Sequence, residues 1–90
     1  MTVRDRMHEA LTRRFAPERL TIDDESHLHA GHAGARPEGE THFRIHIVSA
    51  AFKNKSRIER HRMINAALAA ELAGPVHALA VHAEAPGEGE

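Results

Sequence analysis

Residues 42–83, "HFRIHIVSAAFKNKSRIERHRMINAALAAELAGPVHALAVHA", contain the pattern that decides the fold. The alternation of apolar and polar side chains over 42–49 predicts a half-exposed strand. Residues 56–73 begin with an S-x-x-E capping box, carry apolar side chains at helical spacing and end before Gly-Pro, so we expect a helix there. Alternation returns over 76–83 and predicts another strand. Because strand–helix–strand crossovers are right-handed, the two strands should run parallel.

The segment before this crossover adds one helix and one strand. Apolar side chains at helical spacing predict a helix that starts at Thr2, carries Asp5 as a capping-box variant and stops before Pro17. The stretch "RLTIDDES", residues 19–26, alternates and predicts an edge strand. Glycines and a proline within 30–39 predict the loop that leads into the next strand. Strands joined in this way should run antiparallel.

The expected order is therefore α-β-β-α-β, an α+β domain with a three-stranded mixed sheet and helices on one face. The 90 residues leave room for one domain, which we assign to 1–84, and the acidic residues 85–90 should form a frayed tail. No apolar run approaches a membrane span and the start of the chain does not resemble a signal peptide, so we expect a cytoplasmic protein.

The composition excludes several kinds of functional site. The chain has no cysteine, which excludes disulfides, thiolate metal sites and a cysteine nucleophile. The serines have no recognisable nucleophile setting, and neither a carboxylate pair nor a phosphate-binding loop is evident, so we do not expect an enzyme. The formal net charge is −1 with histidine neutral, but nine histidines make that charge sensitive to pH.

Histidines gather in the segment "ESHLHAGH", residues 25–32, which contains His27, His29 and His32. This loop enters the middle strand at the end of the sheet where the parallel third strand begins, so His77 should lie near it. Neutral imidazole binds iron or zinc, and a loop histidine together with His77 could form a metal or cluster site. The alternative is that the loop histidines are exposed polar residues and that His77 is a partly buried strand residue.

The remaining candidate site is basic and lies at the other end of the sheet. Cations surround the start of the second helix, with His61 among them: Lys53, Lys55, Arg57, Arg60 and Arg62. A helix N-terminus with mobile cations suits phosphate, which favours nucleic-acid binding. Against this, the whole chain is not basic, and its three aromatic residues should all be buried rather than stack on bases. A solvated face is the alternative. His46 and His82 should occupy exposed or rim positions.

Four motifs in register make the chain resemble the BolA family: "DESHLHAGH", "ETHFRIHIVSAAF", "SRIERHRMI" and "ELAGPVHALAVHA". The match runs from the first helix through Ala83. The resemblance implies a fold like the second type of K homology domain and partnership with monothiol glutaredoxins in iron-sulfur cluster handling. In some members it also implies DNA binding and transcriptional regulation.

The resemblance also implies the ligands. In the family these are a residue of the loop after the first strand and the histidine of the V-H-A-L motif, which correspond to His29 and His77, with His32 as the alternative loop ligand. Two imidazoles cannot hold a 2Fe-2S cluster, which takes four ligands. A glutaredoxin cysteine and glutathione would supply the thiolates, so no cluster should bind stably to this chain alone. Monothiol glutaredoxin is therefore the expected partner. DNA is a further candidate partner, and the chain could also form a weak homodimer.

One position departs from the family pattern. Members usually have glycine where this chain has Asn54, in the F-x-G-x-S-x-x-x-R-H segment. Asparagine tolerates the left-handed backbone conformation, so the turn should survive. The chain also lacks the G-x-x-G loop with which K homology domains grip RNA. As a DNA-binding regulator, the alternative function, the chain would use this segment: Lys53, Asn54, Lys55, Ser56, Arg57, Arg60, His61 and Arg62.

Overall fold

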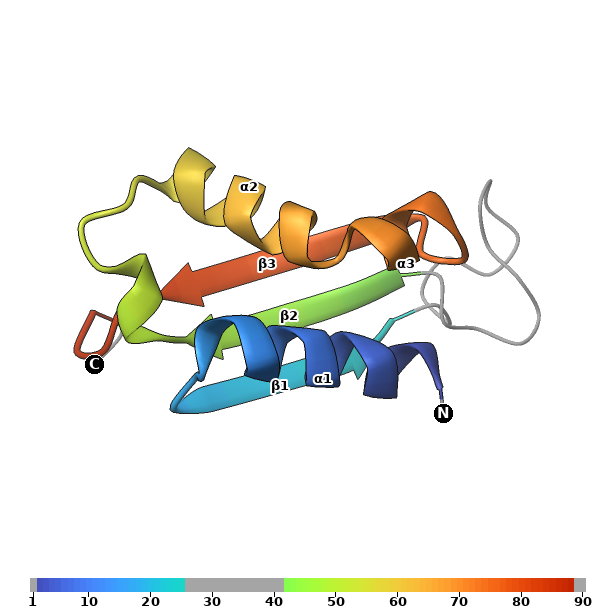
Figure 1. The fold of residues 1–90 in the computed structure, drawn as a ribbon, viewed down its shortest axis with the longest axis horizontal. Helices are drawn as coiled ribbons and strands as arrows, with labels where there is room; N and C mark the ends of the chain where they lie inside the picture. The colour runs from blue at the N-terminus through green and yellow to red at the C-terminus, as the bar shows by residue number, and fades with distance from the viewer. Residues whose placement is uncertain (1, 26–41, 89–90) are drawn as a thin grey trace.

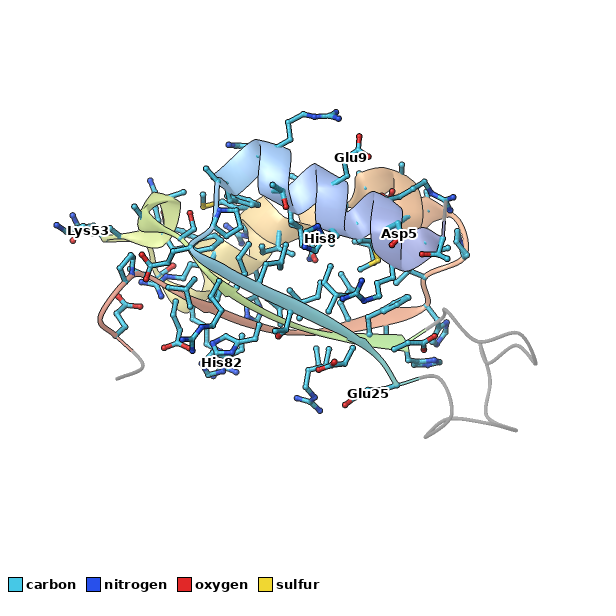
Figure 2. The ribbon with its side chains drawn as sticks, turned by 90° about the horizontal axis from the view of Figure 1, so that it is seen from below. Asp5, His8, Glu9, Glu25, Lys53 and His82 are labelled. Carbon is cyan, nitrogen blue, oxygen red and sulfur yellow. The ribbon has the colours of Figure 1, made fainter. Side chains whose placement is uncertain are left out.

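The computed structural model describes residues 2–25 and 42–88 (Figure 1). Within them the chain forms, in order, α1 (Val3–Phe15), β1 (Arg19–Asp24), β2 (His42–Val48), the 3-10 turn η2 (Ala50–Phe52), α2 (Arg57–Ala67), α3 (Ala69–Ala73) and β3 (Ala78–Glu84). The sheet order is β1-β2-β3, with β1 antiparallel and β3 parallel to β2. Figure 2 shows the helices of the described residues on one side of the sheet, and none of these helices lies over the other side. The predicted α+β fold and its strand directions are confirmed.

The capping box predicted at the start of α1 is present. The Thr2 hydroxyl accepts a hydrogen bond from the Asp5 amide at 3.0 Å, and the Asp5 carboxylate accepts one from the Thr2 amide at 3.3 Å. Hydrogen bonds to the Asp5 carboxylate from the backbone and the side chain of Thr2 hold the pKa of Asp5 below its usual value. The helix ends at Ala16, which has a φ of 43°. Side chains at successive turns face the sheet and are buried, namely Val3, Met7, Leu11 and Phe15.

The core lies between the helices and the covered face of the sheet. The three aromatic residues Phe15, Phe43 and Phe52 are all buried, as predicted. Below α1, the buried hydroxyl of Ser49 donates to the carbonyl of Phe15 at 2.7 Å and accepts from the amide of Ala51 at 3.1 Å. This side chain joins the end of α1 to η2.

The second helix differs from the prediction of one continuous helix over 56–73. It is divided at Leu68, whose φ of −107° and ψ of 21° leave the helical region. The fully buried Leu68 side chain belongs to the core, and its amide still donates to the Ile64 carbonyl at 3.0 Å. The division therefore interrupts the backbone without removing the leucine from the core. After α3, β3 begins at Ala78, so His77 precedes the strand rather than lying within it.

The turn before α2 has the predicted geometry. Asn54 has a φ of 64°, the left-handed conformation expected where the family usually has glycine. Ser56 then caps α2 by accepting from the Glu59 amide at 3.1 Å, while the Glu59 carboxylate accepts from the Ser56 amide at 3.0 Å. The turn at Asn54 and the cap at Ser56 together define where α2 begins.

In the two described ranges, 2–25 and 42–88, every helix is too short or too polar to span a bilayer.

Candidate functional site

His77 lies immediately before β3, and its side chain is exposed. The ring of His42, the first residue of β2, is 5.2 Å from the His77 ring between centroids, with the planes tilted by 53°. His42 is only 7% exposed, so a buried imidazole lies beside an accessible one. This arrangement follows from parallel pairing, because the first residues of β2 and β3, His42 and Ala78, are register partners.

The two residues that flank the histidine loop meet at this end of the sheet. The amide of Glu25 donates to the carbonyl of His42 at 2.7 Å. The predicted loop candidates His27, His29 and His32 lie outside the described residues, so their pairing with His77 stays a prediction. His42 is a neighbour that sequence reasoning missed. It could have been found by noting that parallel strands start at the same end, which brings the residues before and at the two strand starts together.

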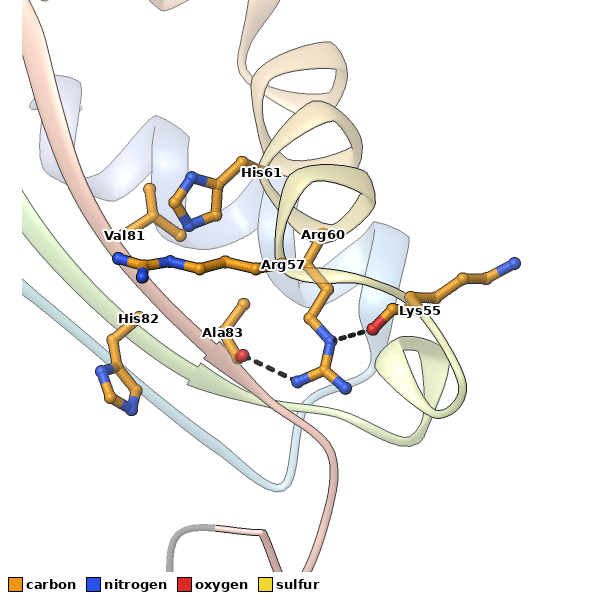
Figure 3. A pocket seen from close by; sticks show the side chains of 7 residues that line it. All are labelled: Lys55, Arg57, Arg60, His61, Val81, His82 and Ala83. Carbon is orange, nitrogen blue, oxygen red and sulfur yellow. Dashed lines mark hydrogen bonds between the residues drawn. The ribbon is translucent and has the colours of Figure 1, made fainter.

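The basic segment borders a surface cavity of about 490 Å³ at the opposite end of the sheet (Figure 3). Its lining combines the start of α2 with the last residues of β3: Lys55, Arg57, Arg60, His61, Val81, His82 and Ala83. Lys53, Lys55, Arg57 and Arg62 are exposed, and His61 is half-buried. Four of the five predicted cations therefore face solvent, and two of these, Lys55 and Arg57, line the cavity.

Arg60 has a different role from the other cations, because it is bonded within the chain. Its guanidinium donates to the Ala83 carbonyl and to the Lys55 carbonyl, both at 3.0 Å (Figure 3). It also forms a two-point pair with the Glu88 carboxylate at 2.6 and 2.9 Å, and its side chain is 13% exposed. The predicted phosphate contact from Arg60 would have to displace these partners.

The same contacts attach residues 85–88, the described part of the expected acidic tail. Ala85 is buried, and its amide donates to the Glu88 carboxylate at 2.8 Å. Hydrogen bonds from Arg60 and from Ala85 lower the pKa of Glu88 to about 2. Over these four residues the acidic segment forms a turn fastened to α2.

His77 and the basic segment lie at opposite ends of the sheet, as predicted. His77 precedes the first residue of β3, whereas Arg60 bonds to Ala83 near the last. Figure 1 shows the start of α2 at the end of β3 to which the arrow points, and α3 at the end where β3 begins. His46 and His82, predicted at exposed or rim positions, are half-exposed and exposed respectively.

Comparison with known proteins gives a consistent result. The family model described as BolA-like protein matches residues 11–88. A Sinorhizobium sp. protein from the cobS 5′ region is 47% identical over 89 residues, covering 98% of this chain and 96% of that protein. Human BolA-like protein 1 is 46% identical over 86 residues, which cover 96% of this chain but 57% of the human protein. Among solved structures, the BolA domain of SufE1 from Arabidopsis thaliana has a TM-score of 0.87 and 42% identity, with 98% of each chain covered.

Proposed function

This chain belongs to the BolA-like family, and from that membership we propose that it is a non-enzymatic adaptor in iron-sulfur cluster trafficking or iron sensing. It binds a 2Fe-2S cluster jointly with a monothiol glutaredoxin. His77 supplies one ligand, and the histidine loop supplies another from His29, with His32 as the alternative. The cluster is a shared cargo, held only while both proteins are together.

The observation that supports this proposal best is the accessible imidazole of His77 at the sheet end where Glu25 and His42 meet. A shared ligand has to reach out of its own protein, and an exposed side chain does so without unfolding any element. The buried ring of His42 lies against that of His77 and limits the directions in which it can turn. His77 is therefore available to a partner and partly oriented before the partner arrives.

Because the sequence contains no cysteine, the sulfur ligands of the cluster have to come from the partner. A 2Fe-2S cluster needs four protein or thiol ligands, and two imidazoles leave two positions for sulfur. The glutaredoxin cysteine and the cysteine of glutathione fill them. The resulting two-nitrogen, two-sulfur composition occurs in Rieske centres, which indicates that such a mixture can hold this type of cluster.

The test is reconstitution with purified components. The protein is mixed with a monothiol glutaredoxin, glutathione, iron and sulfide, and visible absorption and circular dichroism are recorded. We expect no stable cluster on the chain alone and an altered spectrum in the mixture. His77→Ala should abolish the altered spectrum, His29→Ala should weaken it more than His32→Ala, and the exposed His8→Ala on α1 serves as the matched control. An unchanged spectrum with His77→Ala would contradict the proposal.

A second function is supported by the cavity beside the exposed cations Lys55 and Arg57. In this function the chain is a DNA-binding regulator that contacts phosphates with the start of α2. Because Arg60 is engaged with Glu88, the contacts fall mainly to Lys53, Lys55, Arg57 and Arg62. Binding through phosphates depends steeply on salt, so DNA affinity measured over a range of salt concentrations tests this function separately from cluster binding.

A further inference from the structure

The face of the sheet opposite the described helices carries a second group of metal-ligating side chains, from β2 and β3. His46 of β2 and His82 of β3 are register partners, and Glu84 follows His82 by two residues. Since side chains alternate along a strand, these three project from the same face. Figure 2 shows His82 on the side of the sheet away from the helices.

The three side chains already converge on one point. Nε2 of His46 lies 2.6 Å and Nε2 of His82 lies 2.9 Å from the same oxygen, Oε1 of Glu84. The two imidazole rings are 4.9 Å apart between centroids, and one ligand atom from each of the three residues lies within 4.8 Å of the others. From this geometry we propose that His46, His82 and Glu84 form a binding site for a divalent transition metal such as Zn²⁺.

The chemistry of the three donors selects the class of metal. Two imidazoles and one carboxylate make up a set that zinc uses in proteins, with a further position left for water or another ligand. Mg²⁺ and Ca²⁺ prefer oxygen ligands and should bind poorly to a site in which nitrogen supplies two of three donors. Donor atoms about 2.0–2.2 Å from a tetrahedral metal lie roughly 3.4 Å apart, so the present nitrogen–oxygen distances have to open by less than 1 Å.

The protein part of the site is accessible and partly fixed. The side chain of Glu84 is 13% exposed and that of His46 37%, whereas His82 is 69% exposed. The Glu84 carbonyl accepts from the Ser49 amide at 2.9 Å, which holds the backbone that carries the carboxylate. Two ligands are thus held near the sheet while the third can move aside to admit the ion.

Neighbouring cations oppose the ion and set a limit on its affinity. Arg44 and Arg57 line the same surface cavity as His46 and His82, together with the imidazole of His61. Arg44 is paired with Glu25 at 3.0 Å, so part of its charge is offset. We therefore expect binding tighter than to isolated surface histidines and weaker than at a closed four-ligand zinc site.

This site is separate from the one proposed for the cluster. His82 follows His77 by five residues along extended chain, which corresponds to about 16 Å at roughly 3.3 Å per residue. A metal bound at about 2 Å from each ligand cannot be shared between them. The inference therefore stands without the glutaredoxin partnership.

The test is Zn²⁺ titration of the chain alone, with a chromophoric indicator as competitor. Because the histidine loop could bind zinc too, the parent protein carries alanine at positions 27, 29 and 32. We expect one Zn²⁺ per chain, and a loss of affinity of roughly tenfold or more with His82→Ala and with Glu84→Gln. His77→Ala and His8→Ala, two histidines outside the site, should leave the affinity within about twofold.

The exposed position of His82 makes its removal safe for the fold, and far-ultraviolet circular dichroism verifies that each variant is folded. Amide resonances of the parent provide a second readout, since those of residues 46, 82 and 84 should shift first on addition of Zn²⁺. Absence of zinc binding to the parent would overturn the proposal. So would zinc affinity that persists in folded His82→Ala, or that falls with His77→Ala instead.

Discussion

The two ends of β3 use their polar side chains in opposite ways. At the end where the strand finishes, Arg60 is bonded to two carbonyls and to Glu88, so its charge is satisfied inside the chain. At the end where the strand begins, His77 is exposed and lies against the ring of His42. The difference teaches that charge alone does not identify a binding residue. The arginine in the most basic segment is bonded within the fold, whereas the exposed His77 is the residue for which we propose a partner.

The largest effect is expected on cluster binding when His77 is replaced. It tests whether His77 is a cluster ligand or only an exposed side chain. His77→Ala should lower the yield of the mixed glutaredoxin complex roughly tenfold or more, as the loss of a metal ligand does. His77→Cys should restore the complex with a shifted visible spectrum, because thiolate is the usual ligand of such clusters. Visible circular dichroism of the two reconstituted variants measures this. If both variants are folded and neither forms the mixed complex, His77 contributes to the structure of the interface and is not an iron ligand.

The next effect is expected at the other end and on stability. Arg60→Ala removes the hydrogen bonds to Ala83 and Lys55 and the pair with Glu88, and should lower the free energy of unfolding by about 1–2 kcal/mol. The matched control is Arg62→Ala, an exposed arginine two residues later, which should change it by less than about 0.5 kcal/mol. Urea denaturation measures both. If the two variants lower the free energy of unfolding by similar amounts, Arg60 does not stabilise the fold through its internal bonds.

A smaller effect should follow pH. The pKa of Glu88 is about 2 in the folded chain and has an ordinary value of 4.5, so its carboxylate stabilises the fold above pH 4.5. That contribution should be lost as pH falls from 4.5 toward 2. Melting temperatures of the wild type and Glu88→Gln should therefore differ most at pH 6, differ less as the pH falls below 4.5, and converge only as the pH approaches about 2. A difference that stays constant over this interval would contradict the assignment of the stabilisation to the Glu88 charge.

The smallest effect expected is the coupling between the ends. His77 and Ala83 are six residues apart along extended chain, about 20 Å, which exceeds the range over which substitutions usually interact. A double-mutant cycle of His77→Ala and Arg60→Ala, measured by urea unfolding, should give a coupling energy below about 0.5 kcal/mol. A value above about 1 kcal/mol would mean that a conformational change links the two ends.

Local patterns were sufficient to predict the elements and their directions. The capping boxes at Thr2 and Ser56 and the alternation in β2 depend on residues close in sequence, and all three are present in the structure. The division at Leu68 was not predicted, because the alanines and leucines on both sides of it favour helix and no local breaker residue marks the position. The left-handed Asn54 was predictable because the family pattern marked that position.

Two of the side-chain groupings depend on strand register and on contacts distant in sequence, which local sequence patterns do not give. His46, His82 and Glu84 meet only because β2 and β3 pair in one particular register, and alternation fixes a face but not a register. Arg60 was counted among the phosphate-binding candidates because its partner, Glu88, is 28 residues away in an acidic segment. The loop candidates His29 and His32 lie outside the described residues, and their roles rest on the family resemblance.

The buried hydroxyl of Ser49 has a consequence for how the protein opens. It connects the last turn of α1 with η2 across 34 positions of sequence, so α1 cannot detach without leaving this polar group without its partner. We therefore expect the N-terminal helix and the start of the crossover to unfold as one cooperative unit. In native-state hydrogen exchange, the amide of Ala51, bonded to the same hydroxyl, should become exchangeable in the same opening event as the amides in the last turn of α1.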